Sequence, residues 1–179
     1  KNIGEYDSGL YYGNEGLGLS KKINFLKGIA ASYNNIGGIY YEQGNYDKAL
    51  ENYFATLKLV PSGSEGTPHW SKIAANANIN IGNIYMEHGN YDKALEKFLA
   101  SLKICEETGY KKCIATSYNN IGIIYRNQGN YDKALENHFA SLKIREEISD
   151  KKGIADSYVT VGIIYYEQGN YDKAIENYF

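Results

Sequence analysis

The sequence predicts an all-α fold in which pairs of helices stack in single file as a solenoid. One motif, a helix, a glycine turn and a second helix, is written four times, as in SYNNIGIIYRNQGNYDKALENHFASL at residues 117–142. The turn glycines are spaced by 45, 40 and 40 residues, and they are Gly44, Gly89, Gly129 and Gly169. A fixed period in this range is typical of repeat architectures, in which each unit contacts only its neighbours.

The composition narrows the class of protein. With 43% hydrophobic residues and two prolines among 179 residues, the chain is expected to fold. Its 19 basic and 21 acidic side chains give a net charge of −2, which disfavours a nucleic-acid partner. There is no apolar run of the ~20 residues that a membrane span needs, and no signal-peptide pattern. We therefore expect a cytoplasmic protein with no membrane contact.

Residues 1–28 are expected to form the C-terminal half of a preceding repeat. The segment 4–7 (GEYD) lies 40 residues before 44–47 (GNYD), so a second-type helix should follow it. Four glycines fall inside that helix, at positions 9, 13, 16 and 18, and each costs ~1 kcal/mol relative to alanine. The sequence therefore predicts a weak or frayed helix, and an array that continues N-terminally in its parent protein.

The first complete repeat spans residues 29–60. Its first helix, here called helix A, runs from Ile29 to Gln43 and is expected to end at Gly44, which adopts the left-handed conformation without penalty. Asn45 can cap the second helix, helix B. The expected buried face of helix A comprises Tyr33, Ile36, Gly37 and Tyr40, and that of helix B comprises Tyr46, Ala49, Tyr53 and Leu57.

The same pair of helices recurs after an inserted surface loop at residues 61–70. The further repeats span residues 71–109, 110–149 and 150–179, the last cut short within helix B. Asp150 is expected to cap the last helix A. Trp70, in the loop, is a candidate binding residue, but packing against the end of the next helix is the favoured interpretation.

The cysteines and one histidine have structural interpretations. Cys105 and Cys113 flank a predicted turn and could approach each other, but two free thiols in a reducing cytoplasm are favoured. His138 takes the aromatic position of Tyr53 and Phe98, which predicts a partly buried packing residue.

The third repeat carries a recognisable pattern. In helix A it comprises Tyr118, Ile121, Gly122 and Tyr125; after the turn it comprises Gly129, Tyr131, Ala134 and His138. This pattern resembles the tetratricopeptide repeat, although the period is 40 residues instead of 34 and the first position lacks tryptophan. The long period is similar to that of kinesin light chains, Pins-type adaptors and bacterial Rap-type regulators. The resemblance implies a right-handed superhelix whose A helices line a concave groove that binds peptides or protein segments.

The exposed face of the A helices is the predicted binding surface. Asn35, Asn80 and Asn120 share one repeat position, with Thr160 as the fourth. A carboxamide offers the donor and acceptor that an extended peptide backbone pairs with, although three copies of an inert, solvated asparagine remain an alternative. Glutamates at one helix end favour a partner with basic residues. We expect the partner to contact Asn34, Asn35, Tyr41, Glu42, Asn76, Asn80, Asn83, Glu87, Asn119, Asn120, Arg126, Asn127, Thr160 and Tyr166.

Motifs of catalysis or cofactor binding are absent from the sequence. It contains no H-E-x-x-H, no C-x-x-C and no phosphate-binding glycine loop, so we expect no enzyme activity, no cofactor and no metal site. The sequence favours a scaffold for protein binding within a larger signalling or adaptor protein. The alternatives are a structural array that self-associates through uncapped terminal helices and a ligand-sensing regulatory module.

Overall fold

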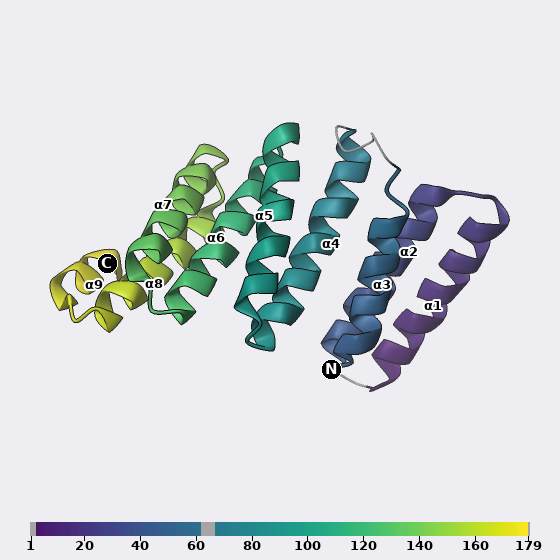
Figure 1. Ribbon diagram of the computed structural model, residues 1–179, viewed down its shortest axis with the longest axis horizontal. Coiled ribbons are helices and arrows are strands. Elements are labelled where there is room, and N and C mark those ends of the chain that lie inside the picture. Colours follow the sequence, from purple (N-terminus) through teal and green to yellow (C-terminus); the bar gives the residue numbers. More distant parts are fainter. Residues whose placement is uncertain (1–2, 62–66, 179) are drawn as a thin grey trace. The chain divides into compact units, whose positions relative to one another are not determined.

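The computed structural model describes residues 3–61 and 67–178, and these residues form α-helices connected by turns (Figure 1). Within these ranges there are nine helices and no strand, which confirms the predicted all-α class. The helices are α1 (Ile3–Lys22), α2 (Leu26–Glu42), α3 (Tyr46–Lys58), α4 (Pro68–Glu87), α5 (Tyr91–Thr108), α6 (Lys111–Asn127), α7 (Tyr131–Glu147), α8 (Lys151–Glu167) and α9 (Tyr171–Tyr178). None of these helices is long and apolar enough to cross a membrane.

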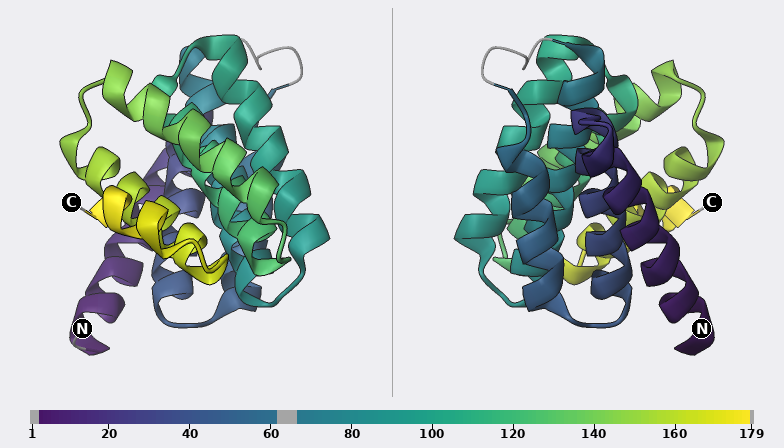
Figure 2. Two further views of the ribbon diagram at one scale, coloured as in Figure 1. Left: turned by 90° about the vertical axis from the view of Figure 1, so that its left-hand side faces the viewer. Right: turned by 90° about the vertical axis from the view of Figure 1, so that its right-hand side faces the viewer.

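The chain divides into two compact units, Lys1–Asn90 and Tyr91–Phe179. In the first unit, α2 packs against α1, α3 and α4, and α3 also packs against α4. In the second unit, each helix from α5 to α9 packs against the next one along the chain. Consecutive helices such as α2 and α3, or α6 and α7, run antiparallel (Figures 1 and 2). The predicted helix pairs are therefore present in each unit.

The turns and caps have the geometry that the sequence predicts. The turn glycines at positions 44, 89, 129 and 169 have φ between +70° and +76°, in the left-handed region. The Asn45 side-chain oxygen accepts a hydrogen bond from the Lys48 backbone N–H at 3.3 Å. The Asp150 carboxylate accepts one from the Gly153 N–H at 3.1 Å. These caps satisfy backbone donors that the first turn of a helix otherwise leaves unpaired.

Helix α1 is one uninterrupted helix of 20 residues in spite of its glycines. Two of the glycines face α2: a Cβ atom at Gly13 would lie 2.9 Å from Ile36 Cγ1, and one at Gly9 would lie 3.1 Å from Ile39 Cδ1. These glycines therefore allow α1 to pack closely on α2. This tertiary contact explains why a sequence of low helix propensity is helical here.

Within each unit, a ring on helix B packs directly on a glycine of helix A. A Cβ atom at Gly37 would lie 2.7 Å from Cε1 of Tyr53 in the first unit. At the equivalent positions of the second unit, a Cβ atom at Gly122 would lie 2.7 Å from Nε2 of His138. A side chain at either glycine would displace the ring, so the close approach of the two helices depends on both glycines.

His138 is more deeply buried than the sequence predicts. It is fully buried, and neither ring nitrogen has a hydrogen-bond partner among the described residues. Burial, and then the positive charges of Arg145 and Arg126, lower the pKa of His138 from 6.5 to about 4. Its repeat position is an interior position, as the buried Tyr53 and Phe98 show.

Cys105 and Cys113 form a disulfide, so the expectation of two free thiols is wrong. The turn at Gly109, which has a φ of +68°, places the last turn of α5 beside the first turn of α6. The two Cα atoms are thereby 5.9 Å apart, within the range of disulfide-bonded residues. Trp70, for its part, lies in the first turn of α4 and is only 8% exposed, as a packing residue would be.

Candidate functional site on the A helices

The A helices α2, α4, α6 and α8 carry the residues that the sequence places on a binding surface. In the first unit this surface contains a pocket of about 640 Å³, which we call the α2 pocket. It is lined by Tyr6, Asn34, Asn35, Gly38, Ile39, Tyr41, Glu42, Tyr53 and Asn80. Five of the predicted site residues are thus brought together around one pocket: Asn34, Asn35, Tyr41, Glu42 and Asn80.

The interior of the α2 pocket is formed by Gly38 and Tyr53. The Tyr53 side chain is only 2% exposed, yet it lines the pocket because Gly38 has no side chain to cover it. A Cβ atom at Gly38 would lie 3.8 Å from the Tyr53 hydroxyl oxygen. Burial, and then the negative charge of Glu42, raise the pKa of Tyr53 to about 12. The pocket therefore combines a buried neutral hydroxyl with a nearby carboxylate.

Helix α1 contributes Tyr6 to the same pocket. The Tyr6 hydroxyl donates a hydrogen bond to the backbone carbonyl oxygen of Glu42 at 3.3 Å. That carbonyl belongs to the last residue of α2. Tyr6 thus ties α1 to the end of α2 and contributes to the pocket lining.

Two asparagines connect α2 and α4 at the pocket. The Asn80 side-chain N–H₂ group donates to the side-chain oxygen of Asn34 at 3.5 Å, the outer limit of a hydrogen bond. A carboxamide has two N–H donors and an acceptor oxygen, so this single bond uses only part of its capacity. Both asparagines are half-buried, and Asn35 beside them is exposed. Amide groups are therefore available at the pocket for a ligand that offers main-chain donors and acceptors.

Glu87 is held by aromatic residues of the first unit. The Tyr41 hydroxyl donates a hydrogen bond to the Glu87 carboxylate. Burial, and then this bond, raise the pKa of Tyr41, and a side-chain hydrogen bond to Glu87 also raises the pKa of Tyr46. The Tyr46 ring also contacts His88 edge to face, with ring centroids 5.0 Å apart. Glu87 is therefore a structural partner of these tyrosines in addition to a candidate binding residue.

Arg126 makes the corresponding contact in the second unit. Its guanidinium donates from Nε to Glu167 Oε2 at 2.9 Å and from Nη2 to the other carboxylate oxygen. This two-bond pair lowers the pKa of Glu167. In both units, then, the side chain at this position of helix A binds the glutamate that ends the next helix A. A partner would meet Arg126 with its charge already compensated.

The remaining predicted residues do not line the α2 pocket. Asn76 and Asn83 lie on α4, Asn119, Asn120 and Asn127 on α6, and Thr160 and Tyr166 on α8. The Thr160 hydroxyl donates to the Asp156 carbonyl one turn earlier, at 2.8 Å. Tyr166 is 61% exposed, and its ring lies 5.4 Å from that of Tyr171. These side chains contribute polar and aromatic groups to the A helices, those of α4 in the first unit and those of α6 and α8 in the second.

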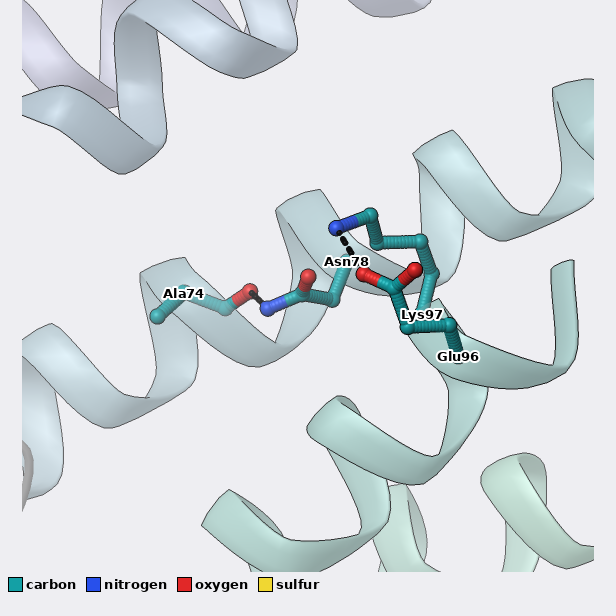
Figure 3. A network of polar contacts seen from close by, with 4 residues as sticks. All are labelled: Ala74, Asn78, Glu96 and Lys97. Carbon is teal, nitrogen blue, oxygen red and sulfur yellow. Dashed lines mark hydrogen bonds and ion pairs between the residues drawn. The ribbon is translucent and has the colours of Figure 1, made fainter. Parts of the chain in front are cut away.

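Figure 3 shows two polar contacts that are local. Asn78 occupies the repeat position that carries Tyr118 in the third repeat, and it is 7% exposed. Its side-chain N–H₂ group donates to the Ala74 carbonyl at 3.0 Å, within α4. Lys97 pairs with its neighbour Glu96 at 2.8 Å, within α5. Each bond closes on its own helix, so neither defines a binding site.

Four residues that line the α2 pocket were not among the predicted site residues: Tyr6, Gly38, Ile39 and Tyr53. Tyr53 could have been found, because Gly38 replaces the larger Asn83, Ile123 and Ile163 of the other repeats and so opens a path to the ring beneath. Tyr6 could have been found from its alignment with Tyr46. No sequence signal distinguishes Ile39 from the other apolar residues of helix A.

The chemistry of the site is that of binding. Amides, hydroxyls and one carboxylate line the α2 pocket, and these groups make hydrogen bonds and attract a positive charge. In the part of the chain that the structure describes, no three His, Cys, Asp or Glu side chains are grouped so that they could hold a metal ion.

Comparison with solved structures shows similar helical proteins. The apo form of RapI is 22% identical with a TM-score of 0.83, over 97% of this chain and 47% of that one. BtubC (BKLC) from P. vanneervenii is 22% identical with a TM-score of 0.71, over 85% of this chain and 61% of that one. MamA is 19% identical with a TM-score of 0.65, over 98% and 85%. At these identities the likeness concerns the fold alone.

Family models give the assignment. Models of the tetratricopeptide repeat match residues 73–138 and 113–178, and another matches residues 30–62. A search of curated proteins found no match. The chain covers 61% of the length of BtubC and 47% of the length of RapI. The repeat matches cover more than half of the sequence and confirm the resemblance drawn from the Tyr, Gly and Ala pattern. The chain therefore belongs to the tetratricopeptide repeat family, whose members generally act as non-enzymatic scaffolds for protein–protein interaction.

Proposed function

We propose that this chain binds an extended segment of a partner protein on the exposed face of its A helices. The observation that carries this proposal is the α2 pocket, which gathers five predicted binding residues around an accessible volume of about 640 Å³. That volume lies in the range of pockets that hold a ligand. We propose further that the 179-residue chain itself is the docking part of a larger signalling or adaptor protein.

The amide groups favour an extended peptide as the ligand. A peptide main chain presents alternating N–H donors and carbonyl acceptors, and a carboxamide pairs with both. Asn34, Asn35 and Asn80 surround the α2 pocket, and Asn119 and Asn120 lie on α6 of the second unit. Main-chain pairing would give affinity, and the side chains that differ between repeats, such as Tyr41 and Arg126, would give preference.

A display screen would test this proposal, with the 179-residue chain as bait for random 15-residue peptides. The asparagine pair Asn80→Ala and Asn120→Ala removes one amide from the A-helix face of each unit. We expect this double variant to lose binding of the selected peptides by at least tenfold, with a nearly unchanged melting temperature.

The chain offers a matched control for that variant. Asn52 and Asn137 lie on the B helices α3 and α7, and each donates to a backbone carbonyl one turn earlier, at 2.8 Å. Asn52→Ala with Asn137→Ala should leave peptide binding unchanged. Unaltered affinity in the A-helix variant, or an equal loss in the B-helix control, would remove the asparagines from the account.

Self-association is a second candidate, favoured by exposed apolar side chains. On α1, Tyr12 is 70% exposed and Leu19 is 60% exposed; on α9, Tyr171 is 59% and Ile175 is 57% exposed. Apolar groups exposed on a helix favour contact with another surface. Sedimentation at increasing protein concentration separates the two candidates, because a binding scaffold stays monomeric while a self-associating array gains mass.

The cytoplasmic location expected from the sequence stays a prediction. Disulfides persist mainly in oxidising compartments, and a reducing cytoplasm would open most of them. The bond between Cys105 and Cys113 is buried, with the two residues 1% and 4% exposed. Trapping thiols with an alkylating reagent in the native host would report the compartment: a reduced pair supports the cytoplasm, and an oxidised pair opposes it.

A further inference from the structure

We propose that the turn between α1 and α2 is a contact site for a membrane surface that carries anionic lipids. The site comprises residues 21–27 (KKINFLK), which we call the α1–α2 tip. This inference goes beyond the proposed function and does not depend on it. The expectation of no membrane contact rests on the lack of a spanning segment, whereas a surface contact needs only a local patch of apolar and basic side chains.

The apolar side chains of the α1–α2 tip are exposed. Ile23 is 73% exposed, Phe25 is 50% exposed and Leu26 is 48% exposed. The isoleucine at the equivalent place in the α7–α8 turn, Ile148, is half-buried. Exposed apolar side chains that gather in one place mark a surface that contacts a partner or a membrane.

Backbone hydrogen bonds hold the tip in one conformation. The Phe25 N–H donates to the Ser20 carbonyl oxygen at 2.8 Å, and the Asn24 N–H donates to the Lys21 carbonyl oxygen at 3.1 Å. Asn24 has a φ of 52°, in the left-handed region that asparagine tolerates. The exposed side chains are thus presented by a preformed turn at one end of the first unit (Figure 1).

Three lysines flank the apolar side chains of the tip. Lys21, Lys22 and Lys27 are exposed, and none of them forms an ion pair with a described residue. Lys21 Nζ lies 5.3 Å from the centroid of the Tyr33 ring, a contact that leaves its positive charge uncompensated. Residues 16–41 contain no acidic residue. The tip therefore carries three positive charges without a carboxylate nearby in the sequence.

The neighbouring helix ends add no negative charge. Helix α3 ends and α4 begins at the same end of the first unit as the tip (Figure 1). Neither the last turn of α3, residues 55–58, nor the first turn of α4, residues 68–71, contains Asp or Glu. Anionic lipids attract such a basic surface, by about fivefold in affinity for each lysine that reaches the membrane.

The combination of charge and apolar side chains is specific to the α1–α2 turn. The α5–α6 and α7–α8 turns also have a left-handed residue at the place of Asn24. Their sequences are EETGYKK (106–112) and EEISDKK (146–152). Both begin with two glutamates where the tip has two lysines, and both have lysine where the tip has Leu26. The repeat fold therefore requires neither the lysines nor the leucine, which points to a function at this turn.

A lipid surface fits the tip better than another protein does. An extended peptide binds in a groove, whereas the tip protrudes, as the 73% exposure of Ile23 indicates. A second copy of the chain would bring the same three lysines into a symmetric contact, where like charges repel. At a membrane, the apolar side chains enter the region below the headgroups while the lysine ammonium groups stay beside the phosphates.

The test measures sedimentation of the 179-residue chain with sucrose-loaded vesicles. One kind of vesicle is phosphatidylcholine alone, and the other is phosphatidylcholine mixed with phosphatidylglycerol, which is anionic. A peptide of ten glutamates is the third probe and represents an acidic protein segment. Because the net charge of the chain is −2, attraction to anionic vesicles requires a local basic site.

The charge of the tip is tested by Lys21→Glu with Lys22→Glu. This variant has the glutamate pair of the other two turns, so the fold should persist, and a melting curve checks that it does. The matched control is Lys151→Glu with Lys152→Glu, at exposed lysines of α8. It changes the net charge by the same amount at a turn without the apolar side chains.

The apolar side chains are tested by Ile23→Thr with Leu26→Gln, which keeps the charge. Threonine is the residue at this place in the α5–α6 turn. The matched control is Leu99→Gln with Val159→Thr, because these side chains are 48% and 49% exposed in the second unit.

We expect the parent chain to bind anionic vesicles at least tenfold tighter than neutral ones. The lysine variant should lose at least tenfold and the apolar variant about fivefold, while both controls bind as the parent does. Higher salt should weaken the binding.

Other outcomes would overturn the inference. Equal binding to the two kinds of vesicle, or binding to neither, would exclude a site for anionic lipids. Binding of the glutamate peptide through the tip lysines, without vesicle binding, would assign the tip to an acidic protein segment. An equal loss in the Lys151 and Lys152 control would show an effect of net charge alone, and an apolar variant that binds as the parent does would show adhesion without insertion. None of these outcomes bears on peptide binding by the A helices, because the α1–α2 tip does not line the α2 pocket.

Discussion

Replacement of His138 by phenylalanine should stabilise the second unit. His138 is fully buried, and its two ring nitrogens have no hydrogen-bond partner among the described residues. Phenylalanine removes both unsatisfied nitrogens and keeps a ring of similar shape. The site accepts larger rings, because the equivalent Tyr53 packs against Gly37 as His138 packs against Gly122.

The magnitude follows from burial. A buried polar group without a partner costs about 1–3 kcal/mol, so His138→Phe should raise the free energy of unfolding by about that amount at pH 7. For a chain of this length, each kcal/mol corresponds to about 2–4 °C in the melting temperature. Phe98→His, at the equivalent position of the second repeat, is the reciprocal change and should lower the melting temperature.

The same substitution should remove a pH dependence. The pKa of His138 is about 4 in the folded state against 6.5 when exposed, so the unfolded chain binds the proton more readily. Stability is therefore fully present above pH 6.5 and is lost as the pH falls toward 4, by about 2 kcal/mol at pH 5 and about 3 kcal/mol in all. Below pH 4 this contribution no longer changes.

Thermal unfolding followed by circular dichroism between pH 4 and pH 8 measures both effects. The parent chain should lose stability across the window, and His138→Phe should be more stable and lose less. Other titrating groups act equally on both proteins, so the difference between the two curves isolates His138. A variant less stable than the parent, or a difference that does not vary with pH, would refute the reasoning.

Two further predictions concern packing and the disulfide. Gly37→Ala should destabilise the first unit by about 1–3 kcal/mol, because its Cβ would lie 2.7 Å from the Tyr53 ring; Gly38→Ala should not, and equal melting temperatures for the two would contradict this packing. The purified chain, unfolded without reductant, should show no free thiol, and two thiols per chain would contradict the bond between Cys105 and Cys113. Its reduction should cost about 2.5 kcal/mol for so short a loop, measured by urea unfolding with and without reductant.

Local features of the fold were predictable because they depend on neighbours in sequence. A glycine with positive φ ends each helix A, as at Gly44, and an oxygen-bearing side chain such as Asn45 or Asp150 caps the helix that follows. The recurrence of these signals at a period of 40 identified the family. The helix ends and the caps depend on geometry within a few residues, so the residue types at these positions predict them.

Features that depend on contacts between helices were harder to predict. The complete burial of His138 follows from how closely α7 approaches α6 at Gly122, which periodicity does not report. The disulfide depends on the 5.9 Å between two Cα atoms across a turn. The sequence analysis favoured free thiols because it expected a cytoplasmic chain. The distance across the turn, which the sequence does not give, allows the disulfide instead.

The candidate site lies between these cases. The amide-bearing face could be predicted from the repeat position of Asn35 and Asn80, but the pocket could not. It exists because Gly38 uncovers Tyr53, a residue of helix B, and because α1 contributes Tyr6. A pocket assembled from four helices requires the tertiary structure; the sequence holds only the glycine at position 38 and the alignment of Tyr6 with Tyr46 as signs of it.

Hydrogen exchange measured with and without a peptide selected on this chain tests the central claim most directly. We expect the peptide to slow exchange in the A helices α2, α4, α6 or α8, with Asn34, Gly38 and Asn80 inside the protected segments. Protection confined to the B helices α3, α5 and α7 would contradict it.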